Sequence, residues 1–153
     1  MATLPSVRIR ILLFDGVAAG VALVMRDIFR AADARLGGGR LDVRLCGRPG
    51  LRALVAGDLS IRLAPLTGRV DHLVVPPLEP GGDPFASRPA EERLLARRHA
   101  AGAVVHAACL GAILVARAGL LAGRRATTHW AWVERAAAGC PEVEWDGTRM
   151  LVD

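Results

Sequence analysis

The chain has 153 residues, 52% of them hydrophobic, which is enough to build one domain with a buried core and argues against intrinsic disorder. No apolar run reaches the roughly 18 residues of a membrane span, and Arg8 and Arg10 interrupt the apolar segment that a signal peptide would need. The formal charge of +5 comes from arginines scattered along the chain, without a basic stripe or a nucleic-acid motif. We therefore expect a single cytoplasmic domain, residues 1–153, that contacts neither a membrane nor DNA directly.

The first half of the chain alternates strand-like and helix-like patterns. A strand is predicted over residues 7–14, with Arg8 and Arg10 on one face, and a helix over 20–36 ends at the glycines 37–39. Three further strand signals follow: a strand over 41–47, a hairpin over 53–66 turning at Gly57-Asp58, and an apolar strand over 70–76.

The second half continues the alternation. A proline- and glycine-rich loop precedes a predicted helix over 90–102, a strand over 103–109 and a helix over 110–123. A short strand or loop over 124–130, a helix over 131–139 and a strand-turn-strand pattern over 143–153 complete the chain. Strands that alternate with helices of this length predict an α/β fold, with a mostly parallel sheet and helices on both of its faces.

Cys109 stands between a predicted strand and a predicted helix. A thiol at a helix N-terminus lies near unpaired backbone N–H groups, which stabilise a thiolate and make it reactive. Free cysteine is also among the most buried residue types, so the spacing leaves open a small core residue at this position. The three cysteines, Cys46, Cys109 and Cys140, show no CxxC pattern and indicate a reducing compartment.

A metal site is the weaker interpretation of this region. His106, Cys109 and His129 include two imidazoles and a thiol, but a fourth ligand and a recognisable zinc spacing are missing from the sequence. We therefore expect no metal and no cofactor.

The segment HAACLGAILVARAGLLAGRRATTHWAWVERAAAGCPEV, together with ILLFDGV and RDIFRAA, closely resembles the ThiJ/PfpI superfamily. The resemblance is strongest to the amino-terminal domain of GlxA/AraC-type transcription regulators and to isonitrile hydratases. It implies a flavodoxin-like sandwich of the ThiJ/PfpI type, here expected without the last strand and helix of the family. In that superfamily the cysteine after the strand is the nucleophile, with a histidine close by, and Cys109 and His129 match these two positions.

Three departures from the family pattern bear on activity. The acidic residue of the first helix, which serves as proton-transfer partner in the family enzymes, is matched by Val21, which cannot transfer a proton. The glycines that supply oxyanion-hole N–H groups are replaced by Pro77 and Leu78, and proline has no N–H. The threonine that follows the cysteine in isonitrile hydratases is Leu110 here.

These departures predict a pocket that binds a ligand rather than catalysing a reaction. Five residues are expected to border it: Val21, Pro77, Leu78, Leu110 and Trp130. The resemblance then implies a ligand-sensing or dimerising regulatory domain, which acts as a homodimer, takes a small-molecule ligand and reaches DNA only through a region absent from this chain. The alternative is a stand-alone cysteine-dependent enzyme, an isonitrile hydratase-like lyase or small hydrolase using Cys109. A third interpretation is a redox sensor in which Cys109 is reversibly oxidised.

Overall fold

The centre of the computed structural model, which describes residues 6–79 and 81–153, is a five-stranded sheet. Every pairing in this sheet is parallel, and the strand order is β5, β2, β1, β6, β7. Its strands are β1 (Val7–Leu12), β2 (Leu41–Gly47), β5 (Ala64–Pro65), β6 (His72–Val75) and β7 (Val104–Ala107). The parallel α/β sheet expected from the alternating pattern is therefore confirmed.

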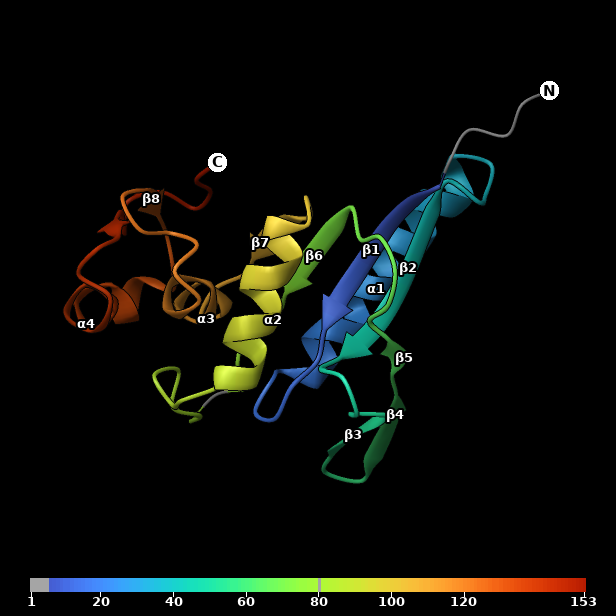
Figure 1. The fold of residues 1–153 in the computed structure, drawn as a ribbon, viewed down its shortest axis with the longest axis horizontal. Helices are drawn as coiled ribbons and strands as arrows, with labels where there is room; N and C mark the ends of the chain where they lie inside the picture. The colour runs from blue at the N-terminus through green and yellow to red at the C-terminus, as the bar shows by residue number, and fades with distance from the viewer. Residues whose placement is uncertain (1–5, 80) are drawn as a thin grey trace.

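Helices cover both faces of the sheet, as Figure 1 shows, with α1 behind β1 and β2 and α2 in front of β7. The helices α1 (Ala19–Arg35), α2 (Pro89–Ala100) and α3 (Gly111–Arg117) bury apolar side chains against the strands. Since α3 has six consecutive buried residues, from Gly111 to Ala116, it is the most enclosed of the three. Each helix in the described part of the chain is too short or too polar to cross a membrane.

The end of α1 is held by a side chain rather than by a further turn of helix. Gly37, Gly38 and Gly39 all adopt positive φ angles, 91°, 79° and 77°, which favour glycine. The Asp33 carboxylate accepts hydrogen bonds from the N–H groups of Leu41, Gly39 and Arg40, and these bonds lower its pKa. The glycine run therefore turns the chain back so that β2 can pair with β1.

The predicted hairpin forms outside the main sheet. Strands β3 (Ala53–Ala56) and β4 (Leu59–Arg62) pair in antiparallel register, and Gly57 in the turn has a φ of 58°. Figure 1 shows this hairpin extending from the lower end of β2 and β5.

The last third of the chain differs from the prediction at two places. The helix predicted over 110–123 ends at Arg117, because Gly119 takes a φ of 78° and the chain then runs as turns. Beyond it lie β8 (Arg125–Ala126), the 3-10 turn η1 (Trp130–Trp132), α4 (Val133–Gly139) and β9 (Glu144–Trp145).

The strand-turn-strand prediction over 143–153 is wrong in its second half. β9 pairs in parallel with β8, and residues 151–153 form no strand. The Asp146 carboxylate accepts from the N–H and hydroxyl of Thr148, while Thr127 donates to the Arg149 carbonyl. Side-chain hydrogen bonds thus hold this segment in a local turn, which competes with a hairpin ladder.

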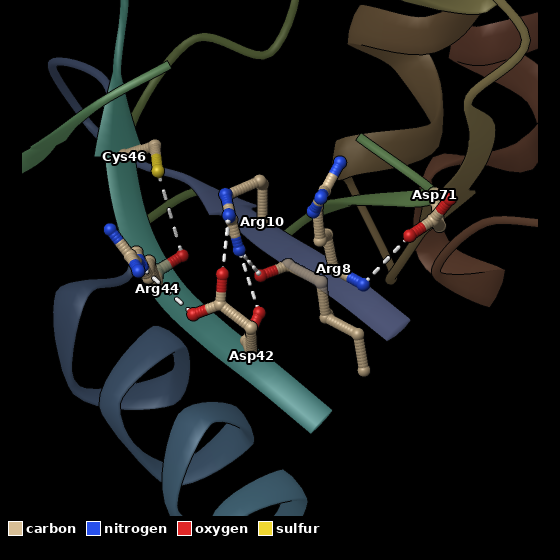
Figure 2. Close-up of polar contacts among 7 residues, drawn as sticks. Arg8, Arg10, Asp42, Arg44, Cys46 and Asp71 are labelled. Carbon is tan, nitrogen blue, oxygen red and sulfur yellow. Dashed lines mark hydrogen bonds and ion pairs between the residues drawn. The ribbon is translucent and has the colours of Figure 1, made fainter. Parts of the chain in front are cut away.

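Charged side chains from β1 and β2 form a cluster around the buried Arg10 (Figure 2). Arg10 is only 6% exposed, and its guanidinium donates to the Asp42 carboxylate at 2.8 Å and to the carbonyls of Ile9 and Asp42. Arg44 binds the other oxygen of the same carboxylate, also at 2.8 Å. Arg8 and Arg10 share a strand face as predicted, but Arg8 remains exposed, so only the tertiary structure distinguishes the two.

Candidate functional site

Cys109 occupies the turn that joins β7 to α3. Its φ angle is 52°, and it is the one residue other than glycine with a positive φ in the described ranges. This left-handed conformation costs a residue with a Cβ about 1–2 kcal/mol. The side chain is exposed, so the thiol is not the buried core residue that the sequence left open.

Close packing of α3 against the backbone at the end of β6 holds this turn in place. A Cβ built on Gly111 would lie 2.6 Å from the Pro76 carbonyl oxygen, so α3 begins directly against the end of β6. The Thr128 hydroxyl donates to the Cys109 carbonyl at 3.0 Å. Leu110 turns inward and is 8% exposed, which leaves Cys109 as the side chain that the turn presents to solvent.

The loops after β1 and β6 lie against each other at the same edge of the sheet. The N–H of Ala18 donates to the Pro77 carbonyl at 2.9 Å, and Val17 and Leu78 form an antiparallel bridge. Leu78 is buried, whereas Val21, in the first turn of α1, is 41% exposed. The carboxyl ends of β1, β6 and β7 thus bring the two loops and the Cys109 turn to one edge, where parallel α/β folds place their sites.

The loops at this edge carry the carboxylates of Asp15 and Glu79, but the helix that follows β1 adds none near its start. The first turn of α1 contains no acidic residue, and Val21 stands in it. Pro77 supplies a carbonyl but no N–H. Among the described residues, no hydrogen bond reaches the Cys109 sulfur.

The His129 ring is oriented by the backbone N–H of a residue two positions further along the chain. Its Nδ1 accepts from the N–H of Ala131 at 3.2 Å, and its ring stacks on Trp130 with centroids 5.4 Å apart. Within residues 81–153, no hydrogen bond joins His129 to Cys109. Trp130 is 77% exposed and therefore presents a flat aromatic surface to solvent.

The other two cysteines have a different environment. Cys46 and Cys140 are buried. Burial raises the pKa of the Cys46 thiol to about 11 and also raises that of Cys140. Because a protonated, enclosed thiol is a poor nucleophile, neither competes with Cys109 for an external reagent.

The sequence did not reveal one pair of side chains. His72 in β6 and His106 in β7 face each other, with 2.9 Å between His72 Nδ1 and His106 Nε2. The two residues are 34 positions apart, and they meet only because β6 and β7 are neighbours in the sheet. The pair could have been predicted from the sequence by placing β6 next to β7 and noting which residues of each strand share a face.

The sequence and fold of this chain were compared with those of known proteins. No protein-family model matches the chain. An uncharacterized protein encoded in the cpoL 5′ region of Streptomyces lividans is 37% identical over 148 residues, which covers 88% of this chain and 95% of that protein.

Solved structures share the fold. A transcriptional regulator protein from Vibrio parahaemolyticus, described as putative, superposes with a TM-score of 0.81 at 22% identity, over 97% of this chain and 80% of its own. An AraC family transcriptional regulator from Pseudomonas putida gives 0.75 at 18% identity, over 92% and 76%. A cysteine-to-alanine mutant of a DJ-1 superfamily protein from Salmonella typhimurium gives 0.71 at 26% identity, over 95% and 76%.

The parallel sheet and the strand-to-helix turn at Cys109, together with these superpositions, define a ThiJ/PfpI-type α/β fold related to the amino-terminal domains of GlxA/AraC-type regulators. The chain belongs to the same family as the Streptomyces lividans protein, and its fold is of the ThiJ/PfpI type.

Proposed function

We propose that this chain is the ligand-sensing or dimerising domain of a GlxA/AraC-type transcription regulator, and that its Cys109 turn does not catalyse a reaction. One observation carries the proposal: the edge that presents Cys109 has no acid in the first turn of α1, where Val21 stands. General acid–base catalysis typically supplies 10²–10⁴-fold in rate, and a valine supplies none of it. The AraC family regulator from Pseudomonas putida and the transcriptional regulator protein from Vibrio parahaemolyticus, which share the fold, support the same function.

The rest of the edge agrees with binding rather than turnover. Pro77 removes a possible oxyanion donor, and loss of one such donor costs about 10²–10³-fold in other enzymes. His129 accepts a backbone hydrogen bond at Nδ1, so that nitrogen is not free to take a proton from the thiol. Val21, Pro77, Leu78, Leu110 and Trp130 would then border a mainly apolar recess that holds a small-molecule ligand.

An assay with isonitriles separates this proposal from the cysteine-enzyme alternative. We expect the chain to hydrate a panel of alkyl and aryl isonitriles no faster than its Cys109→Ser variant. Iodoacetamide should nevertheless label the native protein at Cys109 alone, because Cys46 and Cys140 are buried. Product formation is followed by mass spectrometry, and labelling shows that the thiol was accessible in the same sample. Turnover that disappears with Cys109→Ser would contradict the proposal.

We propose that the homodimer forms through the outer edge of β7. This strand is at the end of the sheet, and within the described ranges no other strand pairs with its outer side. Val104 on β7 is 51% exposed, and an unpaired edge is a ready template for another chain.

The dimer can be tested by placing a charge on the edge. We expect the native chain to sediment as a dimer in analytical ultracentrifugation and Val104→Lys to shift it to the monomer, since lysine on an edge strand opposes pairing. Val55→Lys, on the β3 hairpin and 74% exposed, is the matched control and should remain dimeric. If Val24→Lys, on the exposed face of α1, is the variant that dissociates the dimer, the interface is the helix and not β7.

A further inference from the structure

His72 and His106 present two imidazole nitrogens side by side on one face of the sheet. In the β6–β7 register, His72 pairs with Val104 and Val74 pairs with His106. The histidines are therefore offset by two residues on adjacent strands, so both side chains project from the same face. Their ring centroids are 5.1 Å apart, with an interplanar angle of 37°.

Solvent reaches this face. His106 is exposed, His72 is half-buried, and the neighbouring Val104 is 51% exposed. Figure 1 shows β7 at the end of the sheet, away from α1. The pair is thus accessible to an ion from solution without a rearrangement of the backbone.

The separation of the two nitrogens suits a chelated metal ion. Ligand distances of about 2.0–2.1 Å with an angle between 90° and 109° at the metal place two imidazole nitrogens about 2.8–3.4 Å apart. The observed distance from His72 Nδ1 to His106 Nε2 is 2.9 Å. Strand pairing therefore keeps the two nitrogens within chelating distance. They now face each other across a hydrogen bond, so each ring has to turn for both lone pairs to converge on one ion.

We propose that His72 and His106 form a two-imidazole site for a divalent late transition-metal ion, of the class of Ni²⁺, Cu²⁺ and Zn²⁺. Imidazole is a favoured ligand for these ions. Within residues 6–79 and 81–153 no group of three or more His, Cys, Asp or Glu side chains is placed to hold a metal, so water completes the coordination. The site lies on the sheet face, and its test is independent of any ligand at the Cys109 edge.

Metal binding needs both facing nitrogens deprotonated. In the hydrogen-bonded pair, one neutral ring donates and the other accepts, so a single proton lies between Nδ1 and Nε2. If His72 is the donor, moving its proton from Nδ1 to its own Nε2 frees both lone pairs, and no net proton is released.

Isothermal titration calorimetry with NiCl₂, on the full chain in a buffer that does not bind metals, tests the site. We expect one Ni²⁺ per chain, and at least about a tenfold weaker association for His72→Ala and for His106→Ala, because even the loss of an outer partner weakens metal sites by that much. His99→Ala and His129→Ala are matched controls that remove an imidazole elsewhere, and Cys109→Ser removes the exposed thiol. All three should bind Ni²⁺ as the native chain does.

Three outcomes would overturn the proposal: no binding by the native chain, native affinity in either variant of the pair, or an equal loss in a control. Thermal unfolding followed by circular dichroism shows whether each variant is folded. His72→Gln and His106→Gln replace the alanine variants if those unfold, since glutamine retains most of the side-chain volume and can keep a hydrogen bond. As a second readout, the electron paramagnetic resonance spectrum of bound Cu²⁺ should show two nitrogen ligands in the native chain and one in each variant.

Discussion

Replacement of Gly111 by alanine is expected to destabilise the protein by about 3 kcal/mol or more, at the upper end of the cost of overpacking a core. The added Cβ would lie 2.6 Å from the Pro76 carbonyl oxygen and 2.8 Å from that of Val75. Both atoms belong to the backbone at the end of β6, so no flexible side chain can move aside. Relief requires α3 to shift away from the sheet, and the Cys109 turn shifts with it.

Thermal unfolding measures this effect. For a chain of this size, a loss of 3 kcal/mol lowers the melting temperature by roughly 6–12 °C. Gly20→Ala is the matched control: Gly20 lies in α1, and a Cβ there meets nothing within 4 Å. Because alanine favours helix over glycine by up to about 1 kcal/mol, this variant should be as stable as the native chain or more stable. A similar melting temperature for Gly111→Ala and the native chain would show that α3 does not pack as closely as described.

Removal of the Asp42 carboxylate is the second substitution expected to lower the free energy of unfolding strongly. In Asp42→Ala the Arg10 guanidinium, only 6% exposed, keeps its bonds to two carbonyl oxygens but loses its counter-charge at 2.8 Å. Breaking a buried ion pair by deleting one partner costs about 3–5 kcal/mol. The Asp42 side chain is 28% exposed, so water can reach the vacated position, and we expect a loss of about 3 kcal/mol, at the lower end of that range.

Urea unfolding of Asp42→Ala and of Asp27→Ala provides the comparison. Asp27 pairs with Arg26 at the surface, with side chains 63% and 31% exposed, and its removal should change the free energy of unfolding by no more than about 1 kcal/mol. Equal effects of the two substitutions would mean that the Arg10 charge is solvated in spite of its burial.

The lowered pKa of Asp42 also predicts how the stability difference between the native chain and Asp42→Ala changes with pH. Burial opposes ionisation of Asp42, but hydrogen bonds and charge from Arg44 and Arg10 outweigh it, so the pKa of Asp42 is lowered in the folded protein. A lowered pKa contributes stability above the unfolded value of about 3.9, and this stability is lost as the pH falls through the folded pKa. The difference in stability between the native chain and Asp42→Ala should therefore be constant near neutral pH and shrink below about pH 4. A difference that persists unchanged at pH 2 would contradict this assignment.

The amino-acid sequence by itself determined the order and type of most elements and the position of Cys109 between a strand and a helix. Short apolar runs that alternate with helical periodicity allow few arrangements other than a parallel sheet, because each crossover helix returns the chain to the same end of the sheet. Three glycines at residues 37–39 likewise mark the end of α1, since each adopts a positive φ angle.

Only the tertiary structure decided which polar side chains are buried and which ones meet. Arg8 and Arg10 look alike in the sequence, yet Asp42 on the neighbouring strand β2 pairs with the buried Arg10, whereas Arg8 stays exposed. His72 and His106 come together for the same reason, because strand pairing brings residues 34 positions apart to within 2.9 Å. The segment over 150–153 has a strand-like sequence but no neighbouring strand in the described ranges, and side-chain hydrogen bonds within the turn decide its conformation instead. Local pattern specifies what a segment can form, whereas burial, charge pairing and the choice of partner depend on the packing of segments distant in the chain.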